Sequence, residues 1–195
     1  RIRTLCRMMD RLSRGDIDRV DMDPLHTVMY KQKKTTTAKE WTDILSNAFV
    51  WFDWFCVPQP SVEKDPEKRQ RLRELRKRGT MSMTAYVERA DIFLILAPGC
   101  RHADRFDART KKRQALCYRT WRQQGRCVTD LFASFLSRDK TYPTLLVRSA
   151  EGRPMWVSSV EALKLCVGTS VFGPDCENDI VRRDLEQLIT KKANH

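Results

Sequence analysis

The sequence lacks several features that mark particular classes of protein. Its seven glycines form neither a Walker A loop nor a G-x-G-x-x-G motif, so the common phosphate-binding loops are absent. Its seven cysteines contain no C-x-x-C pair, and no Asn-x-Ser/Thr sequon occurs. The longest apolar run, residues 92–98, is far shorter than the ~20 residues needed to cross a bilayer. These absences argue against a P-loop enzyme, a disulfide-stapled secreted domain and a membrane-spanning protein.

Basic side chains are abundant. The 195 residues include 37 Lys+Arg and 25 Asp+Glu, which gives a formal net charge of +12, and 41% of the residues are hydrophobic. A chain of this length forms one domain, or one domain with extensions, and can bury a sizeable core. The composition therefore predicts a basic, soluble, intracellular protein. We expect a reducing compartment, either the cytoplasm or an organelle matrix or stroma, and a peripheral position on a membrane complex fits as well.

Hydrophobic periodicity predicts alternating helices and strands. Thr37 and Glu40 have the spacing of a capping box, and the apolar residues that follow recur at helical intervals as far as Asn47. Residues 49–57 read as a strand because they are nearly all aromatic or β-branched and end at prolines. Further strands are expected at 91–97 and 144–148. Further helices, or helical starts, are expected within 1–24, 61–79, 82–90, 128–136, from 158, and over 181–189.

Strands that are apolar along their whole length and alternate with helices indicate an α/β fold. The expected architecture is a parallel sheet flanked by helices, with helical extensions at both ends of the chain. In such folds, ligands usually bind beyond the carboxyl ends of the strands. Those ends carry residues 55–59, 98–102 and 148–152, where a site is therefore expected.

Several short motifs follow one another in a distinctive order. They are W-F-D at 51–53, P-Q at 58–59, A-Y-V-E-R at 85–89, D-I-F-L-I-L-A-P at 91–98 and G-x-C-x-x-D-L at 125–131. Their order and spacing resemble Toll/interleukin-receptor-like (TIR-like) domains. They more closely resemble a TIR-like family of unicellular algae and other protists, which has a W-x-D-x-x-x-x-P-Q strand end and an R-G-W-C-R-x-E-L helix start.

The resemblance covers about residues 26–150 and implies a flavodoxin-like, TIR-like domain there. An arm or helix over 1–25 precedes it, and a helical extension over 151–195 follows it. In TIR-like enzymes that cleave NAD, the glutamate of the W-C-x-x-E-L motif begins a helix and faces the ribose. Here Asp130 stands at the glutamate position and Arg126 at the tryptophan position. The resemblance also makes 28–34 the opening strand and loop of the domain. The shorter carboxylate, and the lack of small residues over 28–34, imply a degenerate catalytic site.

Asp130 is the candidate catalytic residue, and NAD is the cofactor only under that hypothesis. The candidate binding residues are Asp53, Gln59, Tyr86, His102, Trp121 and Arg126. Both carboxylates also have plainer interpretations. Asp53 is explained equally by a nearby arginine or backbone amides, and Asp130 by the favourable dipole at a helix start.

A metal site has little support in the sequence. Cys100, His102, Cys117 and Cys127 are the one set of soft or imidazole ligands that lie near each other in the chain. They lack the paired spacing of a zinc knuckle. We therefore expect ordinary thiols and no metal.

The basic stretches 64–78 and 101–126 predict docking. They suit an acidic protein or an anionic membrane surface, and phosphate backbones are the second alternative. The sequence thus predicts a non-catalytic TIR-like interaction or scaffold module, an accessory subunit of a larger complex. The first alternative is an NAD-cleaving enzyme that uses Asp130.

Overall fold

The computed structural model describes residues 2–106, 111–137, 142–165 and 178–193. Short helices predominate. They are α1 (Ile2–Ser13), α2 (Pro24–Tyr30), α3 (Ala38–Ser46), α4 (Asp53–Cys56), α5 (Pro66–Met81), α6 (Met83–Arg89), α7 (Tyr118–Trp121), α8 (Gly125–Leu136) and α9 (Asn178–Ala193), with 3-10 turns η1 (Pro60–Val62) and η2 (Ser159–Lys164). The strands are β1 (Arg19–Asp21), β2 (Thr35–Thr37), β3 (Leu94–Leu96), β4 (Cys100–Phe106), β5 (Arg113–Leu116), β6 (Thr144–Val147) and β7 (Met155–Val157).

The central sheet is small and mixed. Its strand order is β3-β6-β7, with β3 parallel to β6 and β7 antiparallel to β6. The antiparallel pair of β1 and β2, between which α2 is inserted, adjoins β7 through a bridge between Met22 and Trp156. The α/β class is therefore confirmed, but the described sheet is not wholly parallel. Only seven residues separate β6 from β7, and so short a connection permits a hairpin but no crossover helix.

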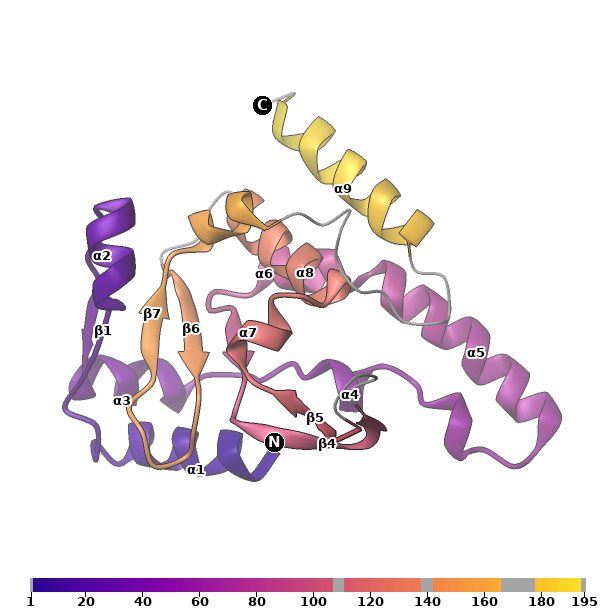
Figure 1. Ribbon diagram of the computed structural model, residues 1–195, viewed down its shortest axis with the longest axis horizontal. Helices are drawn as coiled ribbons and strands as arrows, with labels where there is room; N and C mark the ends of the chain where they lie inside the picture. The colour runs from indigo at the N-terminus through magenta and orange to yellow at the C-terminus, as the bar shows by residue number, and fades with distance from the viewer. Residues whose placement is uncertain (1, 107–110, 138–141, 166–177, 194–195) are drawn as a thin grey trace.

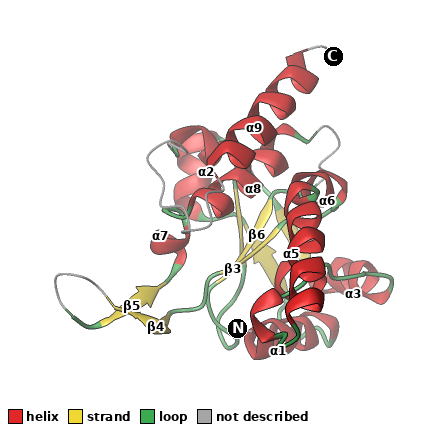
Figure 2. Ribbon diagram, turned by 90° about the vertical axis from the view of Figure 1, so that its right-hand side faces the viewer, coloured by secondary structure: helices red, strands yellow, loops and turns green. Residues whose placement is uncertain are grey.

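Alternate residues of β3 and β6 bury themselves in two different core clusters. Leu145 and Val147 pack with Trp41 of α3 and with Met8 and Leu12 of α1. Ile95, Leu146 and Leu131 of α8 form a second cluster with Val157 and Ala162. Helices thus cover both faces of these two strands, as Figure 2 shows. Both strands were expected to be covered in this way.

The first core cluster centres on two stacked indole rings. The rings of Trp41 and Trp156 lie 5.5 Å apart at 13°. The Trp156 indole Nε1–H donates to Thr36 Oγ1 at 3.1 Å. These contacts join α3, β7 and the β1–β2 strand pair.

Local sequence signals place several elements correctly. Thr37 and Glu40 form the predicted capping box of α3, and Asn47 is its C-cap. The expected strands over 91–97 and 144–148 are present as β3 and β6, and α5, α6, α8 and α9 lie where helices were expected.

Two strand predictions were wrong. Residues 49–52 form no strand and 53–56 form α4, because an apolar run of this length does not distinguish strand from helix. Phe49 and Val50 remain exposed. The segment 28–34, read as an opening strand, contains the end of α2, which starts at Pro24 after the capping carboxylate of Asp23.

Three elements extend from the core. Helix α5 packs on η1 and α6, and none of its residues is buried, so it projects from the body at the right of Figure 1. Helix α9 packs on α8 through Leu188, and the β4–β5 hairpin projects away from the sheet (Figure 2). No helix in the described ranges is long and apolar enough to cross a membrane.

Candidate functional site

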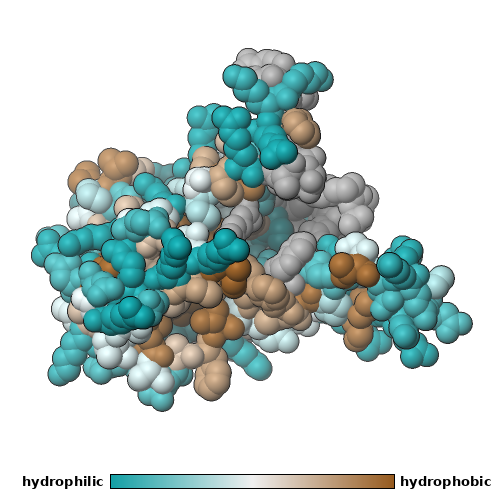
Figure 3. Space-filling view, turned by 90° about the horizontal axis from the view of Figure 1, so that it is seen from below, coloured by the Kyte–Doolittle hydropathy of each residue, from teal (hydrophilic) through white to brown (hydrophobic). Residues whose placement is uncertain are grey.

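A cleft of about 1010 Å³ opens beside the central sheet. Its walls come from α1 and α3 on one side and from α4, α6, α7 and α8 on the other, and Leu96, Ala97 and Pro98 at the carboxyl end of β3 contribute as well. Figure 3 shows apolar side chains gathered across the middle of the lower face, between hydrophilic surfaces on either side. The cleft therefore runs along the β3 segment and reaches its carboxyl end, which is one of the three places where a ligand site was expected.

Exposed aromatic rings form much of one wall. The rings of Trp51 and Tyr86 stack at 4.9 Å and 14°. Their residues are 38% and 48% exposed, and the neighbouring Phe55 is 66% exposed. Large aromatic side chains that stay exposed at a cleft are typical of binding surfaces, because they bury much area at little cost in side-chain entropy.

The carboxylate-bearing residue Asp130 also lines the cleft. Asp130 lies on α8, and its Oδ1 is 3.6 Å from Nε of Arg126, one turn earlier. Arg126 also donates from Nη2 to the carbonyl oxygen of Thr80 at 2.8 Å. Both members of this ion pair are largely buried. The pair therefore joins α8 to the end of α5 and neutralises the candidate catalytic carboxylate.

Two cysteine thiols also border the cleft. Cys117 precedes α7, and the backbone N–H of Thr120 bonds its sulfur, which lowers the pKa of the thiol below its ordinary 9.0. Cys127 donates from Sγ to Gln124 Oε1 at 3.4 Å. Both are free thiols, as are the exposed Cys6, Cys56 and Cys100. In the described part of the chain, no group of three His, Cys, Asp or Glu side chains could hold a metal ion.

A second cavity, of about 150 Å³, adjoins the cleft through Asp53. Gln59, Arg76 and Arg126 line it, and Gln59 donates its side-chain amide to the Val57 carbonyl at 3.1 Å. The basic helix α5 thus reaches this cavity through Arg76.

The sequence-predicted site residues divide between these two cavities. Asp53, Tyr86, Trp121 and Asp130 line the large cleft. Gln59 and Arg126 line the small cavity, which Asp53 shares. His102 belongs to β4, but its side chain lies outside the described residues.

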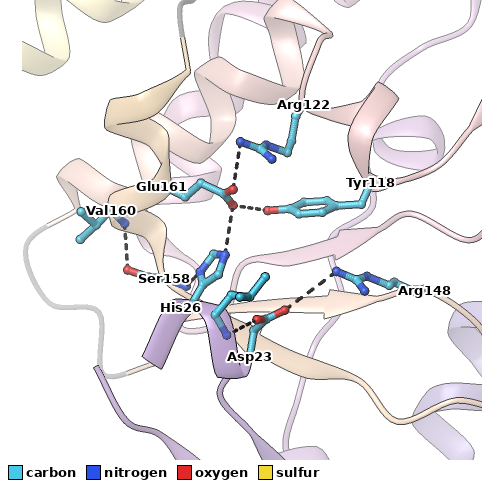
Figure 4. Close-up of polar contacts among 9 residues, drawn as sticks. Asp23, His26, Tyr118, Arg122, Arg148, Ser158, Val160 and Glu161 are labelled. Carbon is cyan, nitrogen blue, oxygen red and sulfur yellow. Dashed lines mark hydrogen bonds and ion pairs between the residues drawn. The ribbon is translucent and has the colours of Figure 1, made fainter. Parts of the chain in front are cut away.

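The sequence reasoning missed a buried polar cluster whose residues line neither cavity (Figure 4). Its centre is the carboxylate of Glu161 on η2, which accepts from the Tyr118 hydroxyl. The Arg122 guanidinium lies 3.0 Å from Oε1 of Glu161, and His26 Nε2 lies 3.7 Å from its Oε2. The cluster joins α2, α7 and η2, so it fixes three separate segments to one another.

Hydrogen bonding defines the protonation states within this cluster. His26 Nδ1 accepts the backbone N–H of Ser158 at 2.9 Å, so the ring proton belongs on Nε2, which faces Glu161. Burial and the adjacent carboxylate of Glu161 raise the pKa of Tyr118, so this phenol stays protonated as the donor. In the sequence, Ser158 and Glu161 indicate only a helix start. No local pattern shows that these two residues contact His26, which lies far away in the chain.

The chain thus contains an aromatic-walled cleft, a basic helix beside it and a buried polar cluster that joins α2, α7 and η2. No protein-family model matches the sequence, and no curated protein or solved structure matches it.

Proposed function

We propose that this chain is a TIR-like protein-interaction module, a basic accessory or scaffold subunit of a larger complex, and not an enzyme. The motifs over 51–131 support the TIR-like assignment of residues 26–150. Two parallel strands with helices on both faces agree with it. Contact with an anionic membrane surface is part of the same proposal.

The single observation that carries the proposal is the aromatic wall of the cleft. Trp51, Phe55 and Tyr86 are exposed among the residues that line a cavity of about 1010 Å³, and the rings of Trp51 and Tyr86 stack on each other. Tyrosine and tryptophan are the residues that most often dominate the energy of protein interfaces. A partner that inserts an apolar side chain here would bury these rings.

Helix α5 supplies a charged surface beside that wall. It has no buried residue, and its exposed basic residues are Lys68, Arg71, Arg73, Lys77 and Arg78. A helix that is polar on all sides gains little from burial within its own chain. An acidic partner surface would complement these charges and raise the rate of association.

The state of Asp130 supports the non-catalytic half of the proposal. An NAD-cleaving carboxylate must bind the ribose hydroxyls, yet Asp130 is paired with Arg126 and is largely buried. Freeing it would break an ion pair that desolvation makes costly to disrupt. Asp130 is also one methylene shorter than the glutamate of active TIR-like enzymes.

The test captures partners with the full chain and locates them by chemical cross-linking. We expect one reproducible partner to cross-link to Lys68 or Lys77 of α5. Trp51→Ala with Phe55→Ala should abolish its capture. The matched control is Val62→Ala with Leu163→Ala, which removes exposed apolar side chains outside the cleft wall and should leave capture unchanged. Equal capture by both double variants would overturn the proposal.

The alternative function, NAD cleavage, has one observation in its favour. Asp130, Trp121 and Tyr86 line a single cleft at the end of β3. An assay of nicotinamide release from NAD decides between the two functions. Release that disappears in Asp130→Asn would establish the enzyme, whereas no release from a chain that binds its partner supports the module.

Nucleic-acid binding is the second alternative, and it rests on the charge of α5. Phosphate contacts make affinity fall steeply with salt, because each neutralised phosphate releases a counterion. Titration of a mixed-sequence RNA and DNA duplex at two salt concentrations tests it. Binding that falls with the number of arginines removed from α5 would favour this function.

A further inference from the structure

Helix α2 carries three large apolar side chains on its outer face. Leu25, Val28 and Met29 are 69%, 79% and 54% exposed. Their spacing of three and four residues puts them on one side of the helix, here called the α2 ridge. His26, the one buried residue of α2, faces the polar cluster around Glu161 (Figure 4).

The surroundings of the α2 ridge are cationic. Residues 24–39 contain four lysines and no carboxylate. Lys31 ends the helix in a left-handed conformation, with φ 53°. Lys164 of η2 lies beside α2, with its ammonium 4.9 Å from the centre of the Tyr30 ring. Lysines therefore border the C-terminal end of the ridge, and the Asp23 carboxylate at its N-terminal end is paired with Arg148.

The geometry of the α2 ridge favours a lipid surface over a protein. Its three side chains line neither cavity, so they project outward. A stable protein interface takes roughly 20–30 residues from each partner, far more than this ridge provides. A few apolar side chains with basic neighbours are enough for peripheral contact with an anionic bilayer.

The helix is also held rigidly enough to present these side chains. The Asp23 carboxylate accepts the Leu25 backbone N–H at 2.9 Å and caps α2. His26 anchors the helix from behind through the Ser158 backbone N–H at 2.9 Å. Because the ridge is ordered before contact, little conformational entropy is lost on docking.

We propose that the α2 ridge docks on an anionic lipid bilayer. Leu25, Val28 and Met29 enter the boundary between headgroups and acyl chains, while Lys31, Lys33 and Lys164 contact lipid phosphates. This inference rests on the proposed function, of which membrane contact is a part, and it assigns that contact to particular residues. Helices α2 and α5 lie at opposite ends of the molecule (Figure 1), so a docked chain keeps α5 accessible to a protein partner.

The test is co-sedimentation of the full chain with vesicles. One set is phosphatidylcholine alone, and the other contains phosphatidylserine at about a third of the lipid, each at roughly 0.1 M and roughly 0.5 M salt. The chain should bind the anionic vesicles at least about tenfold more tightly than the neutral ones. High salt should weaken that binding, and hydrogen exchange should slow over residues 24–34 on the vesicles.

Two pairs of variants assign the contact to α2. Leu25→Ser, Val28→Ser and Met29→Ser together should weaken binding by more than about tenfold, whereas Val62→Ser with Leu75→Ser, exposed apolar residues elsewhere, should not. Lys31→Gln with Lys33→Gln should weaken it more than Arg71→Gln with Arg73→Gln on α5. All these side chains are exposed, and circular dichroism confirms that each variant is folded.

Three results would overturn the inference. They are no binding by the wild-type chain, equal binding by the ridge variant, and equal losses for the α2 and α5 charge variants, which would mean a diffuse electrostatic attraction. Because vesicles contain no protein partner, loss of vesicle binding leaves the capture through the cleft untouched. Failure of that capture likewise leaves the vesicle result standing.

Discussion

Asp130 and Arg126 lie one turn apart on α8, with the carboxylate Oδ1 of Asp130 3.6 Å from the guanidinium Nε of Arg126. Because both side chains are largely buried, each helps to compensate the charge of the other. Arg126→Met should therefore destabilise the fold by about 3 kcal/mol, since it leaves a carboxylate in a poorly hydrated site. Urea unfolding of the variant and the wild-type chain measures the difference.

The double variant tests the cause of that loss. Arg126→Met with Asp130→Leu removes both charges and should recover much of the stability lost in Arg126→Met alone. Strictly additive losses would show that the pair is not coupled. That result would also weaken the argument that Asp130 is committed to Arg126.

The Tyr118–Glu161 hydrogen bond predicts a dependence of stability on alkaline pH. Burial and Glu161 raise the pKa of Tyr118 above its ordinary 10.0 in the folded state. As the pH rises, the unfolded chain therefore loses this proton before the folded chain does. The contribution of Tyr118 to the free energy of unfolding is complete below pH 10 and is lost as the pH rises toward the folded-state pKa.

Tyr118→Phe removes that hydroxyl while keeping the ring. At pH 8 the substitution should cost about 1–2 kcal/mol, because the Glu161 carboxylate loses a charged-group hydrogen bond. The difference between wild-type and variant should shrink between about pH 10 and pH 11. A difference that stays constant over this range would contradict the assignment, and Tyr86→Phe, a half-exposed tyrosine elsewhere, is the control.

The start of α3 could be predicted from the sequence because its capping box depends only on local contacts. Thr37 and Glu40 are three residues apart, so both halves of the motif can be read from four consecutive letters. The strands β3 and β6 could also be predicted from the sequence, because each is a short apolar run that ends near a proline or a charged residue. Their burial on both faces follows directly from that composition.

The wrong predictions and the omissions have a different origin. Residues 49–57 are apolar enough for a buried strand, yet the chain exposes Phe49 and Phe55 and folds 53–56 into a helix, which only tertiary context decides. The cluster of His26, Tyr118 and Glu161 joins residues up to 135 positions apart. Asp53, Tyr86 and Asp130 could be named as candidates, but only the fold brings them to one cleft.

The capping box also predicts an effect of acidic pH. The backbone N–H and the hydroxyl of Thr37 bond the Glu40 carboxylate and hold its pKa below the ordinary 4.5. The contribution of the Glu40 carboxylate to the free energy of unfolding, measured against Glu40→Gln, should therefore be complete above pH 4.5. It should be lost as the pH falls through the lowered pKa. Urea unfolding at pH 7, 5 and 3 checks this, and a difference in unfolding free energy that is as large at pH 3 as at pH 7 would contradict it.

Cys117 should ionise more readily than an ordinary cysteine thiol. The Thr120 backbone N–H and the charge of Arg119 favour its thiolate and lower its pKa below 9.0. The thiolate is the reactive form, so alkylation of Cys117 by iodoacetamide should reach half its maximal rate at a pH below 9.0. Peptide mass spectrometry at a series of pH values measures that midpoint, and a midpoint at or above 9.0 would refute the assignment.

Trp156 contacts several separate parts of the core. Its indole stacks on Trp41 at 5.5 Å and on Tyr142 at 5.7 Å, and its Nε1–H donates to Thr36. Trp156→Ala should lower the free energy of unfolding by about 3–5 kcal/mol, because it opens a cavity between α3, β7 and the β1–β2 strand pair. Thr36→Val isolates the hydrogen bond and should cost about 1–3 kcal/mol, because it leaves a buried indole N–H without an acceptor.

Urea unfolding followed by circular dichroism compares these variants with Trp41→Ala. Because the two rings stack, the losses in Trp41→Ala and Trp156→Ala should not add, and the double variant should reveal a coupling of about 1 kcal/mol. Additive losses would mean that each ring packs against the core independently.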